Sequence, residues 1–153
     1  MTYTTNVILT QKYEVLKPLK VLLAGFVATG AMTLFMIIAP FIGLPKMNFG
    51  EFMGALLGDS MVAGWFMHFA IGIIYAFVYV MFFNHTIPVI KDVFRGMCYG
   101  ILIFMASEII LTTIMMTREI TWAQRENMAV LAFGNCIAHL IYGATLGAFF
   151  KNK

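Results

Sequence analysis

The chain has 153 residues, of which 61% are hydrophobic and only 11% are charged, and its mean hydropathy is +0.89. Soluble domains carry about 25% charged residues, so this composition excludes an ordinary soluble fold and predicts an all-α integral membrane protein. The net charge of +3 comes from Lys and Arg scattered at the ends of hydrophobic segments, which argues against a nucleic-acid partner. The length predicts one domain, residues 1–153, and therefore a single helix bundle.

Four hydrophobic segments are long enough to cross a bilayer as helices, at about 21–43, 61–83, 94–117 and 128–150. The first runs without a charge from Val21 to Gly43, and its roughly 23 residues cover about 34 Å, against about 30 Å for the hydrocarbon core. Pro40 falls in its last turn, where a missing backbone hydrogen bond does least harm. Residues 50–58 are apolar but too short to cross, so they predict a short interfacial helix between the first two spans.

Basic residues lie unequally on the two sides of these spans. Seven share the side of the N-terminus: Lys12, Lys17, Lys20, Lys91, Arg95, Lys151 and Lys153. The opposite side has three: Lys46, Arg118 and Arg125. Because basic loops remain cytoplasmic, both termini are predicted to be cytoplasmic, with the 44–60 and 118–127 connections on the other side.

The two halves of the chain resemble each other at a shift of 71 residues, the interval from His68 to His139. The same shift aligns Lys20 with Lys91, Gly25 with Gly96, Ile38 with Ile109, and Gly72 with Gly143. A period that contains two crossings preserves their direction, so the pattern predicts two tandem two-helix repeats related by an axis along the membrane normal. Chance is the alternative, because Gly and Ile are common in this chain.

Three ionisable side chains fall inside the expected spans: His68, Glu108 and His139. Each is costly in hydrocarbon and therefore needs a partner or a purpose. Counted from the outer helix ends, they lie at depths of roughly 10, 13 and 16 Å, which predicts one polar layer. Met32 and Met36 share a face of the first span at the same level. These five residues form a candidate metal or ion site, because two imidazoles and a carboxylate are a known zinc or iron ligand set.

Glycines lie in helical rows with the two histidines. Gly64 and Gly72 flank His68, and Gly143 follows His139 by one turn. In one reading these glycines leave space for a bulky ligand, such as a haem b held by His68 and His139. In the other, small residues at this spacing let membrane helices pack closely, and the histidines only form hydrogen bonds inside the bundle.

The segments 31–40 (AMTLFMIIAP), 43–47 (GLPKM) and 64–72 (GWFMHFAIG) resemble a broad set of uncharacterised bacterial four-span proteins, classed as domains of unknown function. The resemblance implies a bacterial inner membrane, and it implies no activity and no functional residue.

No catalytic motif occurs, so no catalytic residues are assigned and the chain is not expected to be an enzyme. We expect a non-catalytic inner-membrane protein, an accessory or oligomeric component whose bundle encloses the His/Glu layer. Its partners would be the lipid bilayer and either further copies or a larger membrane complex. One alternative is a haem- or metal-binding electron-transfer protein with His68 and His139 as ligands. Another is a homo-oligomeric transporter of protons, ions or a small solute that acts through Glu108.

Overall fold

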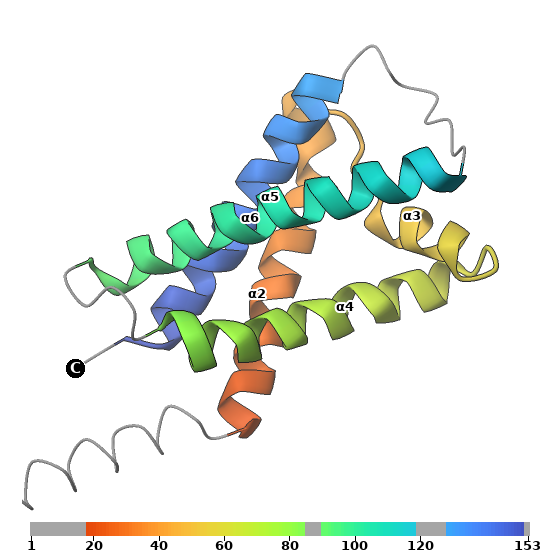
Figure 1. Ribbon diagram of the computed structural model, residues 1–153. Helices are drawn as coiled ribbons and strands as arrows, with labels where there is room; N and C mark the ends of the chain where they lie inside the picture. The colour runs from red at the N-terminus through yellow and green to blue at the C-terminus, as the bar shows by residue number, and fades with distance from the viewer. Residues whose placement is uncertain (1–17, 85–89, 119–127, 152–153) are drawn as a thin grey trace, which may run out of the picture.

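The computed structural model describes residues 18–84, 90–118 and 128–151. Several sequence expectations lie outside these ranges: residues 119–127 of the outer connection with Arg125, and the basic residues Lys12, Lys17 and Lys153. Throughout the described ranges, the regular secondary structure is helical (Figure 1).

The helices follow one another with short connections. They are α2 (Pro18–Ile38), which continues into the 3₁₀ helix η1 (Ala39–Ile42), α3 (Phe49–Leu56), α4 (Met61–Val78), which continues into the π-helical turn η2 (Tyr79–Phe83), α5 (Asp92–Arg118) and α6 (Met128–Phe149). Four stretches are long and apolar enough to cross a membrane: Pro18–Ile42, Met61–Phe83, Asp92–Ile114 and Met128–Phe149. The predicted four-span helical architecture is confirmed, as is a short helix between the first two spans.

Local sequence sets the helix ends. Pro40 lacks a backbone N–H, and α2 tightens into η1 around it before Gly43 ends the helix with a positive φ of 86°. The side chain of Asn48 accepts a hydrogen bond from the backbone N–H of Glu51 and so caps α3. Ser60 caps α4 in the same way through the N–H of Ala63. The connection from the first span to the second is therefore ordered by its own turns and caps.

The two central helices are α2 and α6. In Figure 1 they run steeply through the view while α4 and α5 cross them. Helix α2 packs against both α4 and α6, α5 packs against α6, and the short α3 packs against α4. The first span is accordingly 39% buried and the third only 17%. The chain thus forms two helix pairs, α2 with α4 and α5 with α6, joined through α2 and α6.

Glycines bring paired helices into backbone contact. A Cβ at Gly96 of α5 would collide with the carbonyl oxygen of Gly143 of α6, and one at Gly143 would collide with that of Gly96. In the other pair, a Cβ at Gly25 would meet Ala76 Cβ at 2.9 Å and the Gly72 oxygen at 3.4 Å. Close backbone approach replaces hydrophobic burial as the packing force between helices in lipid, and only glycine permits it here.

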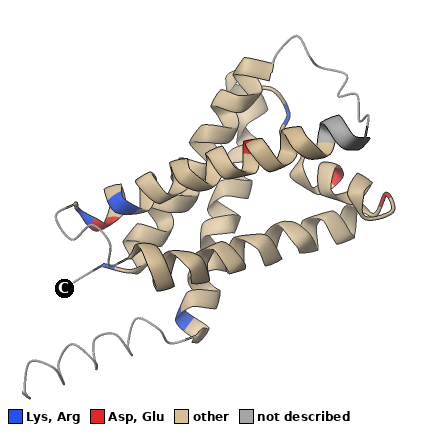
Figure 2. Cartoon of the chain, in the orientation of Figure 1, with Lys and Arg blue, Asp and Glu red and all other residues tan. Residues whose placement is uncertain are grey.

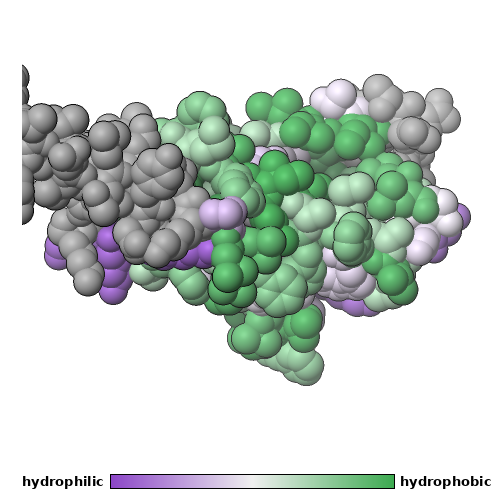
Figure 3. Space-filling view, turned by 90° about the horizontal axis from the view of Figure 1, so that it is seen from below, coloured by the Kyte–Doolittle hydropathy of each residue, from purple (hydrophilic) through white to green (hydrophobic). Residues whose placement is uncertain are grey.

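The surface matches a bilayer environment. Figure 3 shows an apolar band with hydrophilic residues gathered towards its two ends. One end, called the basic end here, carries four basic residues near helix ends: Lys20 in the first turn of α2, Lys91 and Arg95 at the start of α5, and Lys151 after α6. These helix ends lie together, since Lys20 Nζ lies 5.1 Å from the Phe150 ring and Gly147 of α6 contacts Asp92. At that end the guanidinium of Arg95, only 1% exposed, lies 2.6 Å from the carboxylate of Asp92 and donates to the side-chain oxygen of Asn84 at 3.1 Å. The ion pair lies within the first turn of α5 and holds the guanidinium in place, and the hydrogen bond to Asn84 ties the start of α5 to the end of η2.

Tyrosines fill the space between the helix pairs next to the basic end. The ring of Tyr79 packs on that of Tyr99 with centroids 5.1 Å apart. The hydroxyl of Tyr142 donates to the carbonyl oxygen of Gly72 at 2.5 Å, and that of Tyr99 donates to the carbonyl oxygen of Tyr75 at 2.7 Å. We call Tyr79, Tyr99 and Tyr142 the tyrosine layer. It joins α4 and η2 to α5 and α6.

Candidate functional site: a histidine-lined cavity within the bilayer

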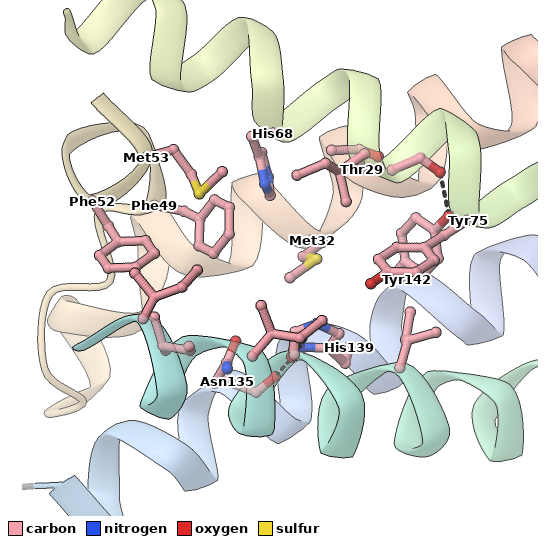
Figure 4. A pocket seen from close by; sticks show the side chains of 17 residues that line it. Thr29, Met32, Phe49, Phe52, Met53, His68, Tyr75, Asn135, His139 and Tyr142 are labelled. Atoms are coloured by element: carbon pink, nitrogen blue, oxygen red, sulfur yellow. Dashed lines mark hydrogen bonds between the residues drawn. The ribbon is translucent and has the colours of Figure 1, made fainter. Parts of the chain in front are cut away.

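A cavity of about 170 Å³ lies between the helix pairs, on the side of the tyrosine layer away from the basic end. Figure 4 shows that both intramembrane histidines border it, His68 from α4 and His139 from α6. Most of its wall is aliphatic, aromatic or thioether. Its lining comes from five helices: Thr29 and Met32 of α2, Phe49, Phe52 and Met53 of α3, His68, Ile71, Gly72 and Tyr75 of α4, Ile103, Ser107, Ile110, Leu111 and Ile114 of α5, and Asn135, His139 and Tyr142 of α6.

His68 stands in an aromatic setting. Its ring centroid lies 4.9 Å from that of Phe49 and 5.7 Å from those of Trp65 and Phe69. Its Nε2 forms a hydrogen bond of 3.1 Å with the hydroxyl of Thr33 on α2. The imidazole is buried, with 5% exposed, and it is held in place by one polar contact and three rings.

His139 is held mainly by its own helix. Its Nδ1 lies 2.9 Å from the carbonyl oxygen of Asn135, one turn earlier, so this nitrogen carries a proton and donates it to that bond. Its Nε2 lies 3.4 Å from the hydroxyl of Ser107 on α5, and that hydroxyl also reaches the carbonyl oxygen of Phe104 at 2.8 Å. The geometry fixes the orientation of the ring and leaves only weak pairing at Nε2.

Glu108 does not share the histidine cavity. It lines a smaller neighbouring cavity of about 90 Å³, together with Lys46, Asn48 and the first residue of α6, Met128. We call this space the outer vestibule, because it lies at the end of the bundle opposite the basic end. One carboxylate oxygen of Glu108 accepts a hydrogen bond of 2.5 Å from the side-chain amide of Asn135.

The two spaces adjoin. Phe49, Phe52, Leu111 and Asn135 line both of them. Asn135 is the polar member of this partition, since its side chain binds Glu108 while its backbone oxygen binds His139. The result is a vestibule that contains two charged side chains, Glu108 and Lys46, next to a chamber that contains no Asp, Glu, Lys or Arg.

The histidine cavity also borders the lipid-facing surface. Ile110 lines the cavity, yet 53% of this residue is exposed on the outside of α5. Helices α4 and α5 are not among the pairs that pack along their length. At this position a single side chain, that of Ile110, lies between the cavity and the surface of α5.

The structure distributes the five residues of the predicted polar site between two spaces. The structure brings His68, His139 and Met32 to one cavity, whereas Glu108 and Met36 line the other. The prediction that the three ionisable groups meet is wrong, because depth along a helix does not set the direction in which a side chain points. Ser107 and Glu108 are neighbours on α5, about 100° apart around the helix axis, and they face different spaces.

The predicted metal site does not fit this arrangement. Among the described residues, no three His, Cys, Asp or Glu side chains converge closely enough to hold an ion. Glu108 is bound to Asn135 in the vestibule instead of facing the imidazoles. The two histidines alone would leave an ion with too few ligands.

The predicted haem site does not fit either. The space beside Gly64 is filled by the backbone of Gly50 and Gly54 of α3, and that beside Gly143 by the backbone of Gly96 and Gly100 of α5. Gly72 borders the cavity, but a Cβ there would collide with the hydroxyl of Thr29. These glycines pack helices and do not leave room for a ligand. A porphyrin also exceeds the drug-sized ligands that already need about 300 Å³ or more.

Sequence reasoning missed several residues that shape the site. Asn135 precedes His139 by four residues, so a search for polar residues at i,i+4 would have found it. Gly50 and Gly54 of α3 repeat the same spacing and pack on Gly64, which brings Phe49 and Phe52 into the wall. Nothing local in the sequence signals that Tyr142 and Thr29 reach α4, because both contacts depend on the arrangement of the helix pairs.

Comparison with known proteins identifies the family. A family model described as a family of unknown function, DUF6789, matches residues 15–152. The chain belongs to this family. The predicted resemblance to a domain of unknown function is thereby confirmed, and the family is DUF6789. No curated protein and no solved structure matches the chain.

Proposed function

We propose that this DUF6789 chain is a non-catalytic multi-pass membrane protein that binds a small, mainly apolar molecule in the cavity between His68 and His139. One observation supports this most strongly. Both intramembrane histidines border the same space of about 170 Å³, and the rest of its wall is largely apolar. Ligand sites are typically apolar pockets with a few placed polar groups that fix orientation.

The cavity volume sets the size of the ligand. A dry apolar cavity of about 150 Å³ in an engineered protein accommodates benzene, so the histidine cavity suits a single aromatic ring or a short branched chain. His139 Nε2 and the hydroxyl of Ser107 border this space and can hydrogen-bond to one polar atom on such a ring. A bound molecule would also recover the dispersion contacts that the lining side chains now lack.

The test uses Trp65, whose ring lies 5.7 Å from that of His68. The chain has two Trp residues, so Trp122→Phe leaves Trp65 as its only Trp, and excitation at the red edge of the Trp band avoids its six Tyr residues. In nanodiscs, para-bromobenzyl alcohol should quench Trp65 with a saturable curve, because bromine quenches tryptophan over short distances and Trp65 packs directly behind His68, which lines the cavity. Ser107→Phe places a ring in the cavity and should weaken this binding about tenfold or more, or about 1.4 kcal/mol.

The matched control is Ala106→Phe, which adds the same ring one residue away on the exposed side of α5. It should leave the saturable quenching intact. Far-ultraviolet circular dichroism and thermal unfolding confirm that both variants fold. Quenching that rises linearly with probe and is the same in both variants would reflect partition into lipid alone, and it would refute the proposed site.

We further propose that the chain lies in a bacterial inner membrane with the basic end and both termini in the cytoplasm. Supporting this, in the described part of the chain Lys20, Lys91, Arg95 and Lys151 lie at the basic end and Lys46 lies at the vestibule, and Figure 2 shows basic residues gathered mainly at the first of these. The equivalent contacts of Gly25 with Gly72 and of Gly96 with Gly143 support a tandem duplication. Protease or thiol-labelling accessibility on intact cells tests the orientation.

Assembly with further copies or with other membrane subunits is part of this proposal, because α5 buries little of its surface within one chain. Native mass measurement in lipid tests it, and a monomer free of partners would count against it. The haem alternative is tested by a visible spectrum after haem-replete expression. We expect no Soret band, and a Soret band lost in His139→Ala would overturn our reading of the cavity.

A further inference from the structure

We infer that the ligand is a lipophilic amine whose apolar part occupies the histidine cavity and whose ammonium group binds Glu108 in the outer vestibule. This inference rests on the proposed function and names the chemical class of its ligand. It starts from the adjacency of the two spaces, which share Phe49, Phe52, Leu111 and Asn135 as wall residues. With volumes of about 170 and 90 Å³, together they approach the size of pockets that hold drug-sized ligands, about 300 Å³.

The polarity of the combined space is asymmetric. The histidine cavity is bordered by apolar side chains, two imidazoles, hydroxyl groups and one amide. No Asp, Glu, Lys or Arg lines it. The vestibule contains the carboxylate of Glu108 and the ammonium of Lys46. A molecule that fills both spaces must therefore be amphipathic, with its polar end towards the vestibule.

Glu108 decides the sign of that polar end. It lies midway along α5, where Figure 2 shows an acidic residue surrounded by uncharged helix. In the described part of the chain its partner is the neutral amide of Asn135, and it forms no ion pair. A carboxylate at this depth is costly unless a cation approaches it. An alkylammonium group supplies that cation and three hydrogen-bond donors.

Lys46 could instead pair with an anionic group on the ligand, but its position favours this less strongly than the position of Glu108 favours a cation. Lys46 lies in the connection between η1 and α3, outside the helices, where a long side chain can extend its ammonium to water at little cost. Its charge is therefore satisfied without a ligand, whereas that of Glu108 is not. The placement of the two charges, one deep and one at the rim, points to an amine.

Three probes of equal size separate the possibilities: para-bromobenzylamine, para-bromobenzyl alcohol and para-bromobenzoate. Each is titrated against the full chain carrying Trp122→Phe, with saturable Trp65 quenching as the readout. The amine should bind about tenfold more tightly than the alcohol. Glu108→Gln should abolish that preference and leave the alcohol unchanged, since the Gln oxygen still accepts the hydrogen bond from Asn135. Glu51→Gln, the same change at an exposed carboxylate of α3 that lines neither space, serves as the matched control and should preserve the preference for the amine.

The outcomes are distinguishable. Equal binding of amine and alcohol, or an amine preference that persists in Glu108→Gln, would overturn the assignment of an amine while leaving the cavity proposal standing. Tightest binding of the benzoate, lost in Lys46→Gln, would overturn it in favour of an acid. If none of the three probes quenches saturably, the proposed function itself fails.

Discussion

The space between the two helix pairs is closed near the basic end and open near the vestibule. In the tyrosine layer, Tyr142 reaches across to Gly72 and Tyr99 reaches across to Tyr75, and their rings fill the interval. Within two helical turns of these tyrosine contacts, His68 and His139 lie on opposite sides of a cavity of about 170 Å³. Helices α4, α5 and α6 contribute to both regions, so the difference between the regions depends largely on the side chains.

This contrast shows that the cavity is a local feature and not a sign of loose packing throughout. Bulky side chains with hydrogen-bonding tips connect helices that cannot approach closely, and glycines connect helices that can. At the depth of the two histidines, neither a bulky side chain nor a glycine contact connects α4 to α5. The polar side chains at this depth bind within their own pair instead, His68 to Thr33 of α2 and His139 to Ser107 of α5. The space between the pairs is left for a ligand.

The largest expected effect comes from the packing within the α5–α6 pair, next to the closed region. Gly143→Leu should destabilise the fold by about 3 kcal/mol or more, because its side chain meets the backbone of Gly96 and Gly100 and neither can yield. Chemical unfolding in mixed micelles measures the loss.

Gly30→Leu is the matched control for that substitution. Gly30 lies in the interior of α2, and a Cβ there would meet nothing within 4 Å. The substitution should leave the unfolding free energy unchanged or raise it slightly, because Leu favours helix over Gly. Equal losses at Gly143 and Gly30 would mean that the α5 and α6 backbones are not in contact.

A second prediction concerns the ion pair at the basic end. Asp92→Asn leaves the Arg95 guanidinium buried with a weaker partner and should cost about 2–3 kcal/mol, below the full range for buried pairs because Asp92 is 23% exposed. Glu51→Gln, an exposed carboxylate on α3, should change stability little. An Asp92→Asn protein as stable as the parent would show that Arg95 does not depend on this pair.

The sequence was sufficient to predict the four spans and part of the candidate site, but not the arrangement of the side chains around the cavity. Segment length and hydropathy were sufficient to predict the four spans, because the thickness of the hydrocarbon core sets the length and its apolar character sets the hydropathy. The depths of His68 and His139 along their spans predicted a common layer, and in the structure both border one cavity. The separation of Glu108 from them was not predictable, because a change of one residue rotates a side chain by about 100°. The tyrosine layer was missed because its partners are carbonyl oxygens, which leave no trace in the sequence.

A third prediction weighs one bond of the tyrosine layer. Tyr142→Phe removes the hydrogen bond to the Gly72 carbonyl oxygen but keeps the ring that fills the interval. Interhelical hydrogen bonds in membranes contribute about 0.6 kcal/mol on average and at most about 1.7, so a loss of about 1 kcal/mol is expected in the same unfolding measurement. A loss of several kcal/mol would instead indicate that this bond holds the two pairs together.

The smallest expected effect lies in the open region. Thr33→Val removes the hydroxyl that binds His68 Nε2 at 3.1 Å and keeps the shape of the side chain. The imidazole borders a cavity and is also held by Phe49, Trp65 and Phe69. Stability should therefore fall by no more than about 0.6 kcal/mol, less than for Tyr142→Phe. The freed nitrogen can then turn to a ligand, so para-bromobenzyl alcohol should bind at least as tightly as to the parent. If Thr33→Val instead costs more than Tyr142→Phe, the histidine level also connects the helices, and its cavity is a strained part of the core and not a site prepared for a ligand.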